Sequence, residues 1–109
     1  MLYLMMQKTD GECLVKVGYS NGQARITNRR ATYYSHNPRA IMRSTCAGST
    51  AMETACRDIL VIKDAQRIPK TEWFVVSPEL FATLYQEGMR YFLPKPTPIH
   101  FLEEFAKTY

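Results

Sequence analysis

Two apolar runs separated by a short polar turn open the chain and limit how its first twenty residues can fold. The runs read LYLMM and CLVKVGYS, and the segment QKTDGE between them contains Asp10-Gly11. An Asp-Gly pair between two strand-like runs is a strong signal for a tight antiparallel hairpin. The sequence therefore predicts two paired strands at the start of the fold.

The middle of the chain predicts helices around a third strand. Residues 21–35 carry a weak amphipathic pattern that predicts a helix, which Pro38 ends because proline disfavours helical angles in the residue before it. The segment RAIMRSTCA predicts the third strand, and Gly48-Ser49-Thr50 predicts a turn and a helix cap. The helix over 50–65 has an apolar stripe of Met52, Ala55, Cys56, Ile59, Leu60 and Ile62.

The last third of the chain predicts one short extended segment and further helices. EWFVVS is typical of a short strand or an extended docking segment. Ser77-Pro78-Glu79 then combines a cap, a proline at the first helical position and an early acidic residue, which predicts a helix over 78–92. Residues 99–109 are expected to form a final helix or a docked tail.

This order of elements predicts the α/β (α+β) class, as a small layered domain with an antiparallel sheet. The length of 109 residues and the 46% hydrophobic content suit a single domain over 1–109. No apolar run approaches the roughly 20 residues that span a bilayer, and the start lacks the features of a signal peptide. We therefore expect a cytoplasmic protein without a membrane partner, in the host cytoplasm if a phage encodes it.

The cysteines and histidines do not form a recognisable metal or disulfide pattern. Cys13, Cys46 and Cys56 are odd in number and lack a C-x-x-C spacing, which predicts reduced and mostly buried thiols. His36 and His100 are far apart in the sequence, so a histidine-based metal site is not expected.

Positive charge is concentrated in one part of the chain. Between Cys13 and Met52 there are six basic residues and no acidic residue, whereas the other residues hold eight basic and ten acidic ones. A partner with a phosphate backbone would favour such a distribution, because neutralising each phosphate releases counterions. A solvated, arginine-rich helix face explains the same charge pattern, so charge alone leaves both interpretations open.

Several short segments, taken in order, resemble the GIY-YIG endonuclease superfamily. They are LYLM, KVGYS, Arg25 in the following helix and Glu53 in the next one. The downstream TEWFVVSPE is similar to the Glu-Trp-Phe segment of the compact, often phage-borne branch, whose second half-motif commonly begins with lysine. The resemblance covers about residues 2–80, so that the C-terminal helices expected over 78–109 lie largely beyond it.

The resemblance implies a small antiparallel three-stranded sheet flanked by helices. It also implies that phosphodiester bonds, most simply those of DNA, are hydrolysed with one Mg²⁺ or Mn²⁺ ion. It makes Tyr3 the general base, places Lys16 and Arg25 on the phosphate and makes Glu53 the metal ligand, while Tyr19 matches a position near the attacking water. A single carboxylate can hold a hydrated hard cation, and a lysine beside a tyrosine favours the phenolate. Further nucleic-acid contacts are expected from Arg29, Arg30, Tyr33, Arg39 and Arg43. Dimerisation to a homodimer would allow two strands to be cut.

The chain also departs from the family pattern. Leu2 replaces the glycine of the first half-motif, Lys16 replaces the second tyrosine, and Arg57 stands where a histidine is common. A non-catalytic nucleic-acid-binding or regulatory protein that retains the nuclease fold is the alternative, and a protein-interaction domain is a more remote one. In these alternatives Tyr3 is a core residue and Glu53 an exposed helix carboxylate. For Trp73-Phe74 we expect closure of the core, with a base-stacking platform as the alternative.

Overall fold

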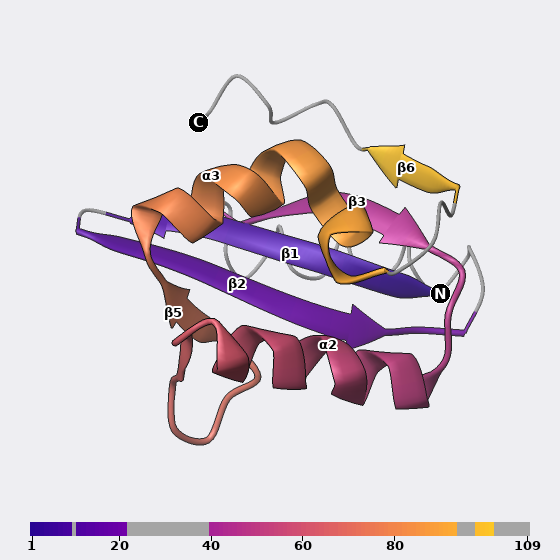
Figure 1. Ribbon diagram of the computed structural model, residues 1–109, viewed down its shortest axis with the longest axis horizontal. Helices are drawn as coiled ribbons and strands as arrows, with labels where there is room; N and C mark the ends of the chain where they lie inside the picture. The colour runs from indigo at the N-terminus through magenta and orange to yellow at the C-terminus, as the bar shows by residue number, and fades with distance from the viewer. Residues whose placement is uncertain (10, 22–39, 94–97, 102–109) are drawn as a thin grey trace.

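The fold is built on a six-stranded antiparallel sheet. A computed structural model describes residues 1–9, 11–21, 40–93 and 98–101. The strands lie in the order β4-β5-β2-β1-β3-β6, and every neighbouring pair is antiparallel (Figure 1). Their bounds are β1 (Leu2–Thr9), β2 (Glu12–Tyr19), β3 (Ala40–Cys46), β4 (Gln66–Arg67), β5 (Phe74–Val76) and β6 (Ile99–Phe101). The α+β class is confirmed, but the expectation of three strands is wrong because β4, β5 and β6 extend the sheet on both sides.

The predicted hairpin forms the centre of this sheet. Strands β1 and β2 pair from Leu2↔Tyr19 to Thr9↔Glu12, which leaves a two-residue connection. Gly11 in that connection has φ +87, a backbone angle that glycine adopts without steric cost. The hairpin predicted from the Asp-Gly signal is thus confirmed.

Both described helices pack on the same face of the sheet. They are α2 (Thr50–Ile62) and α3 (Pro78–Glu87), and the chain continues from α3 into the 3-10 helix η1 (Gly88–Phe92). Alternate strand residues and the inner sides of both helices form the main core, which includes Leu2, Leu4, Met6, Val15, Val17, Cys56, Leu60, Phe81 and Leu84. The opposite sheet face carries a second, smaller buried cluster of Tyr3, Met5, Ala40 and Met42. None of the helices in the described part of the chain is long and apolar enough to cross a membrane.

Helix α2 follows the predicted cap but buries fewer residues than its pattern predicts. The Ser49 hydroxyl accepts a hydrogen bond from the Met52 amide at 3.3 Å, which confirms the cap. Cys56 and Leu60 are buried, whereas Ile62 is 75% exposed. Ile62 lies on the same side of the helix as the exposed Ala55, away from the side that carries Cys56 and Leu60, so including Ala55 and Ile62 in the buried stripe was wrong.

A β-bulge in β3 determines the direction of one predicted site residue. The register of β3 against β1 shifts between Leu4↔Ser44 and Met5↔Met42, so Arg43 has no opposite residue. Its Nε donates a 2.6 Å hydrogen bond to the Tyr85 carbonyl, and its guanidinium lies 4.1 Å from the centre of the Tyr85 ring. Arg43 therefore packs against α3.

The C-terminal part differs from the expectation in two places. The predicted helix over 78–92 begins as expected, with the Ser77 hydroxyl accepting from Leu80, but it changes to 3-10 geometry at Gly88. Residues 99–101 form strand β6, which pairs with β3 from Ser44↔Phe101 to Cys46↔Ile99. A helix beginning at residue 99 is therefore wrong, because this segment satisfies its backbone by extending the sheet. The helix expected over 21–35 lies outside the described residues.

Candidate functional site

Tyr3 and Gly18 are opposite each other on the central strands. The Tyr3 ring occupies the space that a side chain at position 18 would need. A methyl group built on Gly18 would lie 2.3 Å from both Cζ and Oη of Tyr3. Tyr3 is only 1% exposed. The glycine of the Lys-Val-Gly segment is therefore required by the packing of the Tyr3 ring against the backbone of β2.

Lys16 lies on the same sheet face as Tyr3, two residues before Gly18. It pairs with Met5 across the hairpin and is almost buried, with 9% of its surface exposed. Burying a charged amine is costly unless it has a partner of opposite charge. Lys16 has such a partner in Glu72, because its Nζ lies 3.3 Å from the Glu72 Oε2 atom.

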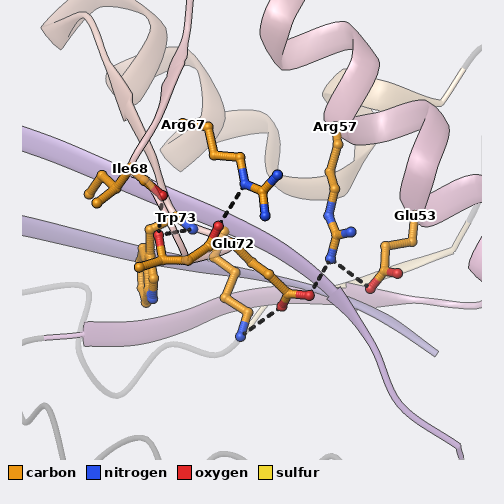
Figure 2. A network of polar contacts seen from close by, with 8 residues as sticks. Glu53, Arg57, Arg67, Ile68, Glu72 and Trp73 are labelled. Atoms are coloured by element: carbon orange, nitrogen blue, oxygen red, sulfur yellow. Dashed lines mark hydrogen bonds and ion pairs between the residues drawn. The ribbon is translucent and has the colours of Figure 1, made fainter.

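Glu72 is held between two cations by a hydrogen-bonded turn. Its other oxygen, Oε1, lies 2.9 Å from Nη2 of Arg57 (Figure 2). The turn between β4 and β5 is closed by the Thr71 hydroxyl, which donates to the Ile68 carbonyl at 2.9 Å and accepts from the Trp73 amide at 3.1 Å. The backbone on both sides of Glu72 is thereby fixed, so its carboxylate is directed at this position by the fold.

The electrostatic environment favours an ionised Glu72. Partial burial acts to raise the pKa of this carboxyl, but the hydrogen bond and charge of Lys16, together with the Arg57 guanidinium, outweigh it and hold the pKa below its ordinary value. Glu72 is thus a carboxylate at neutral pH.

Arg57 joins Glu72 to Glu53, one turn earlier on α2. Its Nη2 lies 3.4 Å from the Glu53 Oε2 atom, and the side chains of Arg57 and Glu53 are 28% and 18% exposed. Two nitrogen atoms of Arg57, Nη2 and Nε, are buried and have no hydrogen-bond partner among the described residues, because the ion-pair contacts of Nη2 do not meet hydrogen-bond geometry. The guanidinium is therefore held by charge, with part of its hydrogen-bonding capacity unused.

These contacts form a continuous charged cluster, which we call the 16–72–57–53 cluster. Strand β5 begins at Phe74, which pairs with Val15, so β5 does not cover the part of β2 after Val15, and α2 lies beside that part (Figure 1). The cluster lies where β5 no longer covers the edge of β2. It links Lys16, on the Tyr3 face, to Glu53 on a helix that covers the other face.

One carboxylate of this cluster, that of Glu53, has the chemistry to hold a hydrated divalent ion. No group of three histidine, cysteine or acidic side chains that could enclose a metal occurs among the described residues. Glu53 offers a partly exposed carboxylate, and Mg²⁺ commonly binds through one or two carboxylates while it keeps several waters. Glu53 is therefore compatible with the predicted ligand role, in competition with the Arg57 guanidinium.

Tyr19 lies apart from this cluster. It alternates with Gly18 along β2, so its ring packs against the main core on the helix-covered face. Its hydroxyl donates to Oδ1 of Asn21 at 2.9 Å. The structure thus brings Lys16 and Glu53 into one cluster and places Tyr3 on the face of Lys16, but it does not bring Tyr19 or Arg43 to them. The other predicted site residues, Arg25, Arg29, Arg30, Tyr33 and Arg39, lie outside the described residues.

The three cysteines are free and buried, as the sequence predicts. Burial raises the pKa of Cys56 to about 11, with smaller contributions from Cys46 and Glu53. Its thiol is protonated at neutral pH, so it does not act there as a nucleophile.

Sequence reasoning missed Glu72 and Arg57 as members of the cluster. Glu72 is part of the Glu-Trp-Phe segment that carries the resemblance, and Arg57 stands four residues after Glu53, where helix geometry brings two side chains together. The ion pairs of Glu72 with Lys16 and with Arg57 join residues far apart in the sequence and could not be anticipated from local spacing. No protein-family model, curated protein or solved structure matches the chain.

Proposed function

We propose that the chain is a metal-dependent nuclease that hydrolyses phosphodiester bonds in DNA. In this proposal Tyr3 is the general base, Lys16 and Arg25 contact the phosphate, and Glu53 is the ligand of one Mg²⁺ or Mn²⁺ ion. The observation that carries it is the 16–72–57–53 cluster, which joins the lysine of the second half-motif to the helix glutamate through the Glu-Trp-Phe segment.

The residue types of the cluster suit phosphodiester hydrolysis. The reaction needs an activated water, charge neutralisation on the phosphoryl oxygens and stabilisation of the leaving oxygen. Lys16 offers an ammonium from an almost buried position, where water screens its charge less than at an open surface. A bound Mg²⁺ or Mn²⁺ would supply Lewis-acid stabilisation of the phosphoryl charge, and Glu53 would hold it.

Two observations favour a second candidate, a non-catalytic nucleic-acid-binding protein with this fold. Tyr3 is 1% exposed, as a core residue would be. The Glu53 carboxylate already has a cation, since Arg57 lies 3.4 Å away. In this candidate the charged cluster stabilises the fold, and cations elsewhere on the surface bind the phosphate backbone.

Cleavage assays separate the two candidates. Labelled single- and double-stranded DNA and RNA are incubated with wild type in Mg²⁺, in Mn²⁺ and in chelator, beside Tyr3→Phe and Glu53→Gln. The nuclease proposal predicts metal-dependent cutting by wild type that each substitution abolishes, while binding of the same substrate persists. Tyr91→Phe and Glu87→Gln are the matched controls, because they make the same chemical changes outside the cluster and should cut like wild type.

The second candidate predicts a different result. Every variant would then bind nucleic acid, and none would cut any substrate in either metal. Full cutting activity in Tyr3→Phe or in Glu53→Gln would refute the role assigned to that residue.

A further inference from the structure

We infer that Lys16 and Arg57 form a binding subsite for a backbone phosphate, and that Glu72 fills this subsite in the free protein as an internal competitor. The identity of the ligand as nucleic acid rests on the proposed function. The subsite itself rests on the geometry around the Glu72 carboxylate.

The two oxygens of Glu72 are divided between the two cations. Oε2 lies 3.3 Å from the Lys16 ammonium, and Oε1 lies 2.9 Å from the Arg57 guanidinium. Two non-bridging oxygens of a phosphodiester present the same kind of paired anionic acceptor, and arginine and lysine are the side chains that bind them. A phosphate can therefore take the place of the carboxylate without any rearrangement of Lys16 and Arg57.

The carboxylate is the most exposed member of this trio. The side chain of Glu72 is 48% exposed, compared with 28% for Arg57 and 11% for Lys16. A ligand from solvent therefore meets the carboxylate first, and Glu72 can leave along the same direction. Its side chain can rotate away while the turn keeps the backbone fixed, because the hydrogen bonds of the turn involve Thr71, Ile68 and Trp73.

Arg57 retains unused capacity for an anion. The contact of its Nη2 with Glu72 does not satisfy hydrogen-bond geometry, and both Nη2 and Nε are buried without a hydrogen-bond partner among the described residues. Buried donors in proteins are nearly always paired. The carboxylate thus leaves hydrogen-bonding capacity of Arg57 unused, which favours exchange for a ligand with more acceptor oxygens.

The charge balance of the cluster supports a competing role for Glu72. Lys16 belongs to the stretch from Cys13 to Met52, which contains no acidic residue, and Glu72 is supplied by a turn outside it. With Lys16, Arg57, Glu53 and Glu72 all ionised, the cluster is neutral and attracts a phosphate weakly. Displacing Glu72 restores one unit of positive charge at the subsite.

The test compares Glu72→Gln with Glu87→Gln, which makes the same change of net charge on the exposed end of α3. Binding of labelled DNA and RNA is measured by fluorescence anisotropy in chelator over a range of salt concentrations. We expect Glu72→Gln to bind about three- to tenfold more tightly than wild type at low salt, and Glu87→Gln to bind like wild type. The gain should disappear in the Lys16→Met background and in the Arg57→Gln background, where the subsite lacks one of its cations. Thermal unfolding of every variant checks that each is folded.

Equal or weaker binding by Glu72→Gln than by Glu87→Gln overturns the inference, as does a gain that persists without Lys16 and Arg57. If the variants bind nucleic acid as expected but none cuts it, the nuclease proposal fails and the subsite stands. If no variant binds nucleic acid, inorganic pyrophosphate is titrated while the fluorescence of Trp73, the single tryptophan of the chain and the neighbour of Glu72, is followed. Tighter pyrophosphate binding by Glu72→Gln then supports the subsite, and equal binding or none by both proteins overturns it.

Discussion

Replacing Gly18 by alanine tests whether the Lys-Val-Gly segment requires a glycine because the Tyr3 ring packs against its backbone. The new methyl group would lie 2.3 Å from Cζ and Oη of Tyr3 and 2.6 Å from Cε2. Carbon atoms in favourable contact lie about 3.5–4.0 Å apart. The ring would therefore have to move by more than about 1 Å, and it cannot move freely because it is 1% exposed and its strand is paired on both sides.

The expected cost follows from overpacking. Adding a methyl group to a well-packed interior typically costs about 1–3 kcal/mol, and the short contact here places Gly18→Ala toward the upper end. For a domain of this size each kcal/mol lowers Tm by about 4–8 °C. The displaced ring should also lower cleavage activity, since Tyr3 is the proposed general base.

A double-mutant cycle isolates this contact. Gly18→Ala is made in wild type, in Tyr3→Phe and in Tyr3→Leu, and the free energy of unfolding is measured by denaturant titration monitored by circular dichroism. The penalty should persist in Tyr3→Phe, which keeps Cζ and Cε2. It should shrink by at least about 1 kcal/mol in Tyr3→Leu, which lacks these atoms. An equal penalty in all three backgrounds would show that Gly18 is needed for another reason.

Further predictions concern stability at three other places. Ser44→Ala should cost about 1–3 kcal/mol in denaturant titration, because the buried Ser44 hydroxyl accepts from the Met89 amide at 2.9 Å and its loss leaves that amide unpaired; a cost below about 0.5 kcal/mol would contradict this. Ser77→Ala should cost about 1 kcal/mol through loss of the α3 cap, and Ser77→Asp should restore the stability. The pKa of Glu72 is lowered in the fold, so its contribution is present above its unfolded pKa near 4.5 and is lost as pH falls below that value through the folded pKa. Tm should therefore fall less between pH 5 and more acidic pH in Glu72→Gln than in wild type, and identical pH profiles would refute this contribution.

Local signals predicted much of the fold because they act over a few residues. Asp10-Gly11 predicted the hairpin, and Ser49 and Ser77 predicted the starts of both described helices. Of the strands that extend the sheet, β5 lies within EWFVVS, which the sequence predicted as a short strand or an extended docking segment, whereas β4 and β6 were not predicted. β4 has two residues and β6 has three, too short to show an alternating pattern, and each forms only because an edge of the sheet is available.

The same distinction applies to the candidate site. Tyr3, Lys16 and Glu53 were predicted from motif order, and the structure links Lys16 and Glu53 through two side chains that sequence reasoning did not select. The pairing of Lys16 with Glu72 depends on where β5 begins against β2, which is a property of the assembled sheet. Tyr19 was predicted as a site residue, but strand geometry places it elsewhere. Adjacent residues of a strand face opposite sides of the sheet, and Gly18 lies on the Tyr3 face, so Tyr19 faces the main core.

The central claim is that Glu53 supports metal-dependent cleavage of a phosphodiester. The most direct measurement incubates one labelled DNA with wild type, Glu53→Gln and Glu87→Gln in Mn²⁺ and in chelator, and follows binding and cutting in the same samples. We expect cutting in Mn²⁺ by wild type and Glu87→Gln, no cutting by Glu53→Gln, and comparable binding by all three proteins. Cutting by Glu53→Gln at the wild-type rate, or binding by wild type with no cutting in Mn²⁺, would contradict it.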